Sequence, residues 1–146
     1  MDDDGRIDAE LIAALRAHGH RVTGPRLIVY RHLRQQDGHL RAEQVHSDLV
    51  ARAPSLSPAT VYATLDLLAE LGLIRRMSTP HGVALFDTRI GRHHHLLCRS
   101  CDAITDLEAP VGTTSAYAAA AATGFTVEHS ELQITGLCDA CAKAGR

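Results

Sequence analysis

Ser57-Pro-Ala-Thr-Val-Tyr-Ala-Thr-Leu-Asp-Leu-Leu-Ala-Glu-Leu-Gly72 is the stretch that decides the fold of the first half of this chain. Ser57 is a preferred N-cap residue, Pro58 suits the first helical position, and Gly72 is typical of the residue just past a helix end. Apolar residues recur at intervals of three and four, as on the buried face of a helix: Val61, Leu65, Leu68 and Leu71. The stretch therefore predicts an amphipathic helix.

Polar side chains gather near the N-terminal end of this helix. Thr60, Tyr62 and Thr64 lie off the apolar stripe. A recognition helix presents side chains to bases and phosphates from this part of its surface. An ordinary solvated helix face would have the same pattern, so the helix alone leaves both interpretations open.

The residues after the helix favour DNA binding. Residues 73–77 and 83–86 are strand-like, and residues 78–82 supply a turn between them. Arg75 and Arg76 lie on the first strand. Helices that end in a two-stranded hairpin describe a winged helix-turn-helix domain. Double-stranded DNA is the expected partner.

Three shorter helices are predicted before this one. The first begins at Asp8, as its N-cap, and stops at Gly19; the acidic run at residues 2–4 before it reads as a disordered tail. Thr23 caps the second helix, and His39 leads into the third. Residues 11–80 carry nine Arg against five acidic residues, although the whole chain has a net charge of −2. The front half is thus mildly basic.

The cysteines predict a closed metal site. All four fall in two Cys-x-x-Cys pairs: Cys98, Cys101, Cys138 and Cys141. Two such turns can supply the four corners of a tetrahedral, structural zinc site. A redox motif or two disulfides are the alternatives. No signal-peptide pattern is visible and no apolar run is long enough to span a bilayer, so we expect a soluble, cytoplasmic protein with reduced thiols.

A family resemblance joins these features. The run Leu56–Leu65, then Leu71-Gly-Leu-Ile74, a His-x-His-x-x-Cys-x-x-Cys motif from His93 and a late Cys-x-x-Cys resemble, in this order, the ferric uptake regulator (Fur) family of metal-dependent repressors over residues 10–142. The resemblance implies an α+β chain, with a winged-helix domain at 1–86, a hinge at 87–92 and an α/β dimerisation domain at 93–146. It also implies a homodimer on a palindromic operator.

The same resemblance implies a DNA-contacting surface, with one departure from the family pattern. The family usually has Arg directly after the Val-Tyr pair, where this chain has Ala63. One phosphate or base contact is therefore absent, which weakens DNA affinity or alters operator preference. The residues expected at this surface are Arg21, Arg26, Ser57, Thr60, Tyr62 and Thr64.

A second, regulatory metal site is expected near the His-rich segment. His93 and His95 alternate on a predicted strand, so both side chains point to one face, whereas His94 points to the other. Taken alone, His39 is a solvated or capping residue and Asp87 a turn residue. The resemblance implies that five residues are ligands to Fe2+ or Mn2+: His39, Asp87, His93, His95 and Asp106.

The ligand at position 106 separates branches of the family. Iron-sensing members commonly have Glu there and peroxide-sensing members Asp, and this chain has Asp106. In the peroxide-sensing branch, hydrogen peroxide oxidises a ligand histidine at bound Fe2+ and DNA is released; the corresponding residues here are His39 and His93. An iron-supply sensor is the main alternative. A third metal site that would use His94 or His129 is only weakly indicated.

Two other classes compete with a repressor. Clustered His and carboxylate side chains also build metalloenzyme centres. However, the sequence has no His-Glu-x-x-His helix, phosphate-binding Gly loop or nucleophile motif, so we expect no enzyme. A metal chaperone or buffer would not need the winged-helix half.

Overall fold

The computed structural model describes residues 3–146, which divide into two compact units. The N-terminal unit runs to Ser78 and includes Gly82–Ile90; the C-terminal unit comprises Thr79–His81 and Gly91–Arg146. The boundary between Ile90 and Gly91 falls within residues 87–92, and the proposal that this segment is a hinge stays a prediction. No helix among the described residues is long and apolar enough to cross a membrane.

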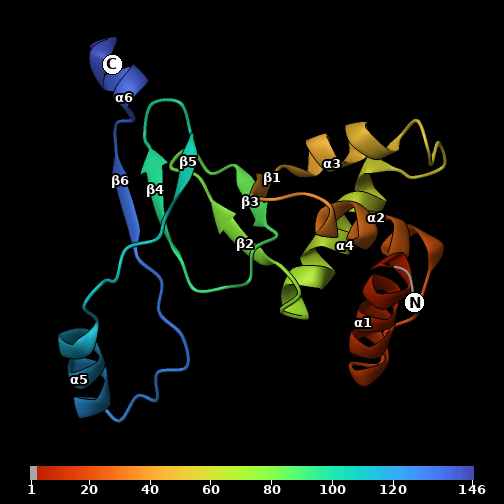
Figure 1. The fold of residues 1–146 in the computed structure, drawn as a ribbon, viewed down its shortest axis with the longest axis horizontal. Coiled ribbons are helices and arrows are strands. Elements are labelled where there is room, and N and C mark those ends of the chain that lie inside the picture. The colour runs from red at the N-terminus through yellow and green to blue at the C-terminus, as the bar shows by residue number, and fades with distance from the viewer. Residues whose placement is uncertain (1–2) are drawn as a thin grey trace. The chain divides into compact units, whose positions relative to one another are not determined.

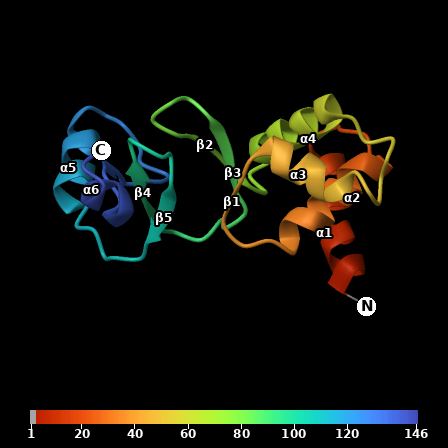
Figure 2. The ribbon, with the colours of Figure 1, turned by 90° about the horizontal axis from the view of Figure 1, so that it is seen from above.

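The N-terminal unit is a winged helix-turn-helix (Figures 1 and 2). Four helices form its bulk and a three-stranded antiparallel sheet of order β1-β3-β2 adjoins them. Its elements in chain order are α1 (Asp3–Ala17), α2 (Gly24–Arg34), β1 (His39–Leu40), α3 (Ala42–Leu49), α4 (Pro58–Glu70), β2 (Arg75–Ser78) and β3 (Ala84–Asp87). The predicted α+β class is confirmed.

Helix α4 forms for the reasons that its sequence gives. The Ser57 hydroxyl accepts a 3.1 Å hydrogen bond from the backbone N–H of Thr60, and Pro58 occupies the first turn. Gly72 has φ of 71°, the left-handed conformation that follows many helix ends. Val61 and Leu65 of the apolar stripe are fully inaccessible and Leu68 is buried, whereas Leu71, at the helix end, is only partly buried. The helix is thereby fixed by one face and leaves its N-terminal end at the surface.

Helix α1 differs from its prediction. It begins at Asp3, so the expectation of a disordered tail was wrong for Asp3 and Asp4; Asp2 lies outside the described residues. Asp8 is not an N-cap but a mid-helix residue whose carboxylate accepts a 2.6 Å hydrogen bond from Nε of Arg31. Asp8 therefore joins α1 to α2 instead of capping a shorter helix.

His39 also lies elsewhere than predicted. It belongs to strand β1 rather than to a helix, and α3 begins only at Ala42. In the antiparallel pairing of β1 with β3, His39 lies opposite Asp87. The sheet, and not a helix, therefore sets the distance between these two residues.

Truncating the centre of the N-terminal core should destabilise that unit strongly. Leu65 is fully buried against the other helices, and replacing such a Leu by Ala costs about 2–5 kcal/mol. We expect Leu65→Ala to lower the midpoint of urea unfolding followed by circular dichroism. Exposed Glu70→Ala in the same helix is the matched control and should leave the midpoint in place. Equal midpoints for the two variants would contradict this packing.

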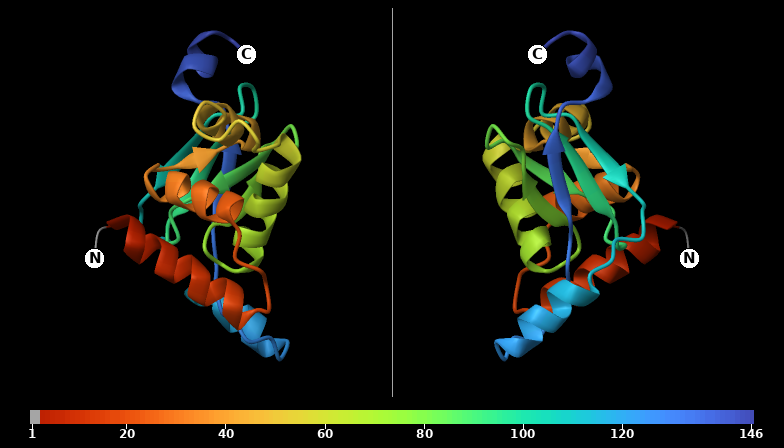
Figure 3. Two further views of the ribbon diagram at one scale, coloured as in Figure 1. Left: turned by 90° about the vertical axis from the view of Figure 1, so that its right-hand side faces the viewer. Right: turned by 90° about the vertical axis from the view of Figure 1, so that its left-hand side faces the viewer.

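The C-terminal unit has a small sheet of order β5-β4-β6. Strand β4 pairs antiparallel with β5 and parallel with β6, which runs beside it in Figure 3. The elements are β4 (His94–Cys98), β5 (Ile104–Leu107), α5 (Thr114–Ala122), β6 (Gln133–Gly136) and α6 (Asp139–Lys143). Helix α5 has no buried residue, and α6 has one, Cys141.

Candidate metal centres and DNA-binding surface

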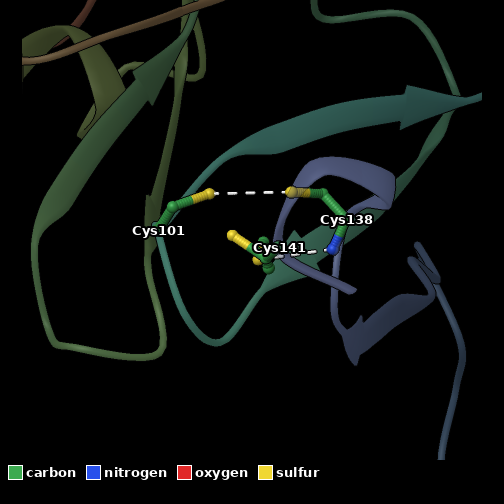
Figure 4. A group of neighbouring side chains, drawn as sticks. Cys101, Cys138 and Cys141 are labelled. Carbon is green, nitrogen blue, oxygen red and sulfur yellow. Dashed lines mark hydrogen bonds between the residues drawn. The ribbon is translucent and has the colours of Figure 1, made fainter. Parts of the chain in front are cut away.

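The four cysteines of the C-terminal unit converge, and Figure 4 shows three of them, Cys101, Cys138 and Cys141. Cys98 and Cys101 flank the turn after β4, and Cys138 and Cys141 lie at the start of α6. All four sulfurs lie within 4.8 Å of one another, and Cys101 Sγ is 3.8 Å from Cys138 Sγ. Ligands at zinc–sulfur distances of about 2.3 Å in a tetrahedron are separated by about 3.8 Å. The geometry thus fits a shared ion, and all four thiols are free of disulfides.

Backbone amides prepare this group for a cation. The N–H of Cys138 donates to Cys98 Sγ over 3.4 Å. This amide, together with the amides of Cys101 and Ser100, lowers the pKa of the Cys98 thiol to about 6. Cys98 is therefore mainly a thiolate at neutral pH, the form in which cysteine binds metal. Asp102, at φ of 58°, closes the turn with a 3.0 Å bond from its N–H to the Cys98 carbonyl.

A second potential ligand group in the same unit combines two imidazoles and a carboxylate. Nε2 of His93 lies 3.7 Å, and Nε2 of His95 3.8 Å, from the same oxygen, Oδ1 of Asp106. His95 and Asp106 are opposed in the β4–β5 pairing, and His93 precedes β4 by one residue. Both His side chains are buried. Alternation along the chain at His93 and His95, together with the β4–β5 pairing, therefore brings these three residues together; that they bind a metal stays a prediction.

The two imidazoles are oriented from behind. Nδ1 of His93 lies 2.8 Å from the carbonyl of Gly91, and Nδ1 of His95 lies 2.7 Å from Oε1 of Glu131. Because these oxygens accept hydrogen bonds, Nδ1 of each imidazole is the protonated nitrogen of the contact. Nε2 of each ring, which lies on the side of Asp106, is then the nitrogen left to bind a metal.

The remaining predicted ligands lie in the N-terminal unit. His39 Nε2 is 3.8 Å from Oδ2 of Asp87, whose side chain is fully buried. The other carboxylate oxygen, Oδ1, accepts a 2.9 Å hydrogen bond from the backbone N–H of Arg89. This bond fixes the carboxylate so that Oδ2 faces the imidazole.

His94 and His129 do not join a further ligand group. Nδ1 of His94 accepts a 3.1 Å hydrogen bond from the backbone N–H of Leu132. His129 is exposed, with Nε2 4.0 Å from Glu131 Oε2. Across residues 3–146, neither His belongs to a cluster of three or more potential ligands. The structure thus gives no support to the third site.

The predicted DNA-contacting residues lie around the N-terminal end of α4. Tyr62 is 39% exposed, and its hydroxyl donates a hydrogen bond to the Glu43 carboxylate. The Thr60 hydroxyl is 2.9 Å from that of Ser57. Thr64 is buried, at 3% exposure, so its side chain is less accessible than expected. Thr60 and Thr64 line a shallow hollow with residues of α2 and with Ala63.

Arginines border the same surface. Arg26 lines the hollow and donates a hydrogen bond to the carbonyl of Arg21, and both arginines are at least partly exposed. Guanidinium groups beside a recognition helix suit contacts to phosphate oxygens. The sequence did not indicate two further residues. Glu43 accepts a hydrogen bond from the Tyr62 hydroxyl, and Glu131 lies beside Nδ1 of His95.

Comparisons with known proteins agree with this architecture. The model of the ferric uptake regulator family matches residues 17–135. The chain is 30% identical over 142 residues to the peroxide-responsive repressor PerR of Staphylococcus epidermidis, covering 95% of both chains. It is 36% identical over 119 residues to ferric uptake regulation protein 1 of Mycolicibacterium fortuitum, covering 81% of this chain and 73% of the relative.

Among solved structures, the Helicobacter pylori ferric uptake regulator Fur, described as having three functional metal binding sites, is similar with a TM-score of 0.79. The alignment covers 97% of this chain and 95% of that one at 17% identity, so it bears on the fold alone.

Proposed function

Because the chain belongs to the ferric uptake regulator family of metal-dependent transcriptional regulators, we propose that it is a repressor whose DNA binding requires Fe2+ or Mn2+ and ends on exposure to peroxide. The observation that carries the proposal is the coexistence of two donor sets in one chain. One set is four thiols, and the other combines imidazoles with carboxylate. A site without thiolate binds Fe2+ or Mn2+ less tightly than four thiolates bind zinc, so its occupancy can follow supply.

The cysteine group fits a structural Zn2+. Four sulfur donors close a tetrahedral site and leave no position for substrate or exchange. Cys141 is the only buried residue of α6, so the thiolates attach this helix to the turn after β4. We assign the zinc a stabilising role only.

We propose as regulatory ligands the five residues that the family resemblance implies. His93, His95 and Asp106 belong to the C-terminal unit, and His39 and Asp87 belong to the N-terminal unit. Side chains of both units at one ion would hold the units in one relative arrangement. If DNA selects that arrangement, metal and DNA must each tighten the binding of the other by the same factor.

Two observations support the proposed peroxide sensitivity: the presence of Asp106, and the similarity to the peroxide-responsive repressor of S. epidermidis. Bound Fe2+ would supply the redox chemistry that activates hydrogen peroxide, with the ring C–H as the net source of electrons. In the net change, a ring C–H of His39 or His93 becomes C–OH and the peroxide's second oxygen leaves as water. The altered ring is a poorer ligand, so the site loses its ion and the operator is released.

We further propose a homodimer on a palindromic operator. Helix α5 has no buried residue within one chain, and the C-terminal sheet leaves Leu96, Leu132 and Ile134 between 36% and 45% exposed. Exposed apolar side chains on so small a unit favour a protein partner. A second copy would bury them and present two recognition helices to two half-sites.

DNA binding measured against metal tests the proposed function. Fluorescence anisotropy with operator fragments selected from genomic DNA should show tight, sequence-specific binding with Mn2+. That binding should weaken after removal of the regulatory metal and with added salt. Equal binding with and without metal, or no binding to any fragment, would remove the repressor proposal. An iron-supply sensor remains the second candidate, because the relative from M. fortuitum is the more identical of the two.

Removing the Tyr62 side chain should weaken operator binding. Tyr62 projects from the exposed part of α4, where a base contact is worth about 1–3 kcal/mol, or about fivefold to 150-fold in affinity. We expect Tyr62→Ala to show that loss in anisotropy while keeping wild-type affinity for Mn2+. Glu70→Ala, at the exposed C-terminal end of the same helix, is the control. Normal operator binding by Tyr62→Ala would mean that α4 is not the recognition helix.

A further inference from the structure

We propose that Glu131 is a positioning residue for the regulatory metal site, which fixes the tautomer and ring orientation of His95. The inference rests on the proposed function and adds to it a residue outside the five predicted ligands. The contact is direct: Oε1 of Glu131 lies 2.7 Å from Nδ1 of His95. Nothing in the local spacing indicates it, because 36 residues separate the two.

The segment that carries Glu131 is fastened to β4. The backbone N–H of His95 donates to the Leu132 carbonyl over 3.0 Å, and the Leu132 N–H donates to His94 Nδ1 over 3.1 Å. The parallel β4–β6 pairing continues this attachment, with His95 opposite Gln133. The two residues that follow Glu131 are therefore bonded to or paired with His94 and His95, which holds Glu131 beside the His95 ring. The same bonds give His94 a structural role.

Burial of the His95 side chain and partial burial of Glu131 restrict the orientation of the His95 ring. The His95 side chain is 1% exposed and that of Glu131 21% exposed. Two more groups approach the carboxylate: Gln133 Nε2 donates to Oε1 over 3.3 Å, and His129 Nε2 lies 4.0 Å from Oε2. A carboxylate behind a ligating imidazole holds the proton on Nδ1 and strengthens the Nε2 lone pair as a donor. Nδ1 of His93 instead lies 2.8 Å from a backbone carbonyl, that of Gly91.

The two His ligands are thus supported differently. The backbone carbonyl of Gly91 orients His93, whereas the side-chain carboxylate of Glu131 orients His95. Only the carboxylate can be removed by substitution. Substitution of Glu131 can therefore weaken the site without touching a ligand or a sulfur. Outer-shell partners of this kind typically contribute about 10–100-fold to metal affinity.

The test uses the full-length, zinc-loaded protein with Mn2+ as the probe. Mn2+ affinity is measured by calorimetry and electron paramagnetic resonance for wild type, Glu131→Gln and Glu131→Leu. Exposed Glu128→Gln is the matched control. Long-range 1H–15N NMR of 15N-His protein, without Mn2+, reports which nitrogen of His95 carries the proton. Zinc content and melting temperature are recorded for each variant.

We expect Glu131→Leu to lose Mn2+ affinity by about 10–100-fold and to show a mixture of His95 tautomers, with one zinc per chain and an unchanged melting temperature. Glu131→Gln keeps an oxygen acceptor and should lose less. Glu128→Gln should match wild type in every measurement.

Three results would overturn the inference. Wild-type Mn2+ affinity in Glu131→Leu removes it, and so does an unchanged His95 tautomer. Loss of zinc or a lowered melting temperature in both Glu131 variants would make the residue part of the fold rather than of the site. By contrast, a wild-type protein that binds no Mn2+ overturns the proposed function, and the tautomer measurement still decides whether Glu131 sets the His95 proton.

Discussion

Replacing Cys98 by Ser is expected to release the zinc and unfold the C-terminal unit. Structural zinc sites contribute about 10–16 kcal/mol of binding free energy, whereas whole domains are stable by only about 5–15 kcal/mol. Backbone amides lower the pKa of the Cys98 thiol, and its sulfur accepts a hydrogen bond from the Cys138 N–H, so the substitution removes a stabilised thiolate from the site. Without a metal, α6 has no buried side chain other than Cys141 to keep it in place.

The measurements are zinc content by mass spectrometry and hydrogen exchange of each unit. In Cys98→Ser, amides of β4 and β6 should lose protection while α2 and α4 keep theirs, because the N-terminal unit has its own core. Ser100→Ala, in the same turn, is the control and should retain one zinc per chain. Chelation of the wild-type zinc should reproduce the variant. A zinc-free Cys98→Ser protein with full protection in β4 would contradict a stabilising role for the metal.

Local signals in the sequence predicted most of the elements. Helix α4 has a cap, a proline and an apolar stripe within one stretch, and it forms as expected. The hairpin of β2 and β3 was also predicted correctly, because two short apolar runs flank a turn in the sequence. Helix α1 was misread because Asp8 satisfies the rules for an N-cap, yet the structure uses it to bind Arg31. Here a tertiary ion pair prevailed over a local preference.

The candidate sites divide in the same way. The spacing of His93 and His95 placed both on one strand face, and the Cys-x-x-Cys pairs placed the sulfurs in turns. His39 was misassigned because a two-residue strand has no periodicity of its own and exists only through pairing with β3. Glu131 left no signal, because its contact depends on the parallel β4–β6 register. The spacing of residues in a sequence does not predict contacts across a sheet between residues that are distant in the chain.

Brief exposure of the Fe2+-loaded protein to low hydrogen peroxide is expected to add one oxygen to His39 or His93 and to weaken operator binding strongly. DNA affinity should fall by up to about 100-fold, the upper part of the usual range for coupled sites. Trypsin cleaves after Arg34, Arg41, Arg92 and Arg99, so His39 lies in peptide 35–41 and His93 in peptide 93–99. Fragmentation then assigns the oxygen by mass spectrometry.

Peptide 93–99 has its own controls, because His94 and His95 lie in it beside His93. His94 binds a backbone amide and His95 is supported by Glu131, so oxygen confined to His93 would show chemistry at a particular ring rather than general damage. Mn2+-loaded protein should stay unmodified and bound to DNA, since Mn2+ does not supply the electrons as readily. His93→Ala should lose metal-dependent binding before any peroxide is added. Unmodified histidines at full iron occupancy, with DNA still bound, would instead make iron supply the signal and favour the second candidate function.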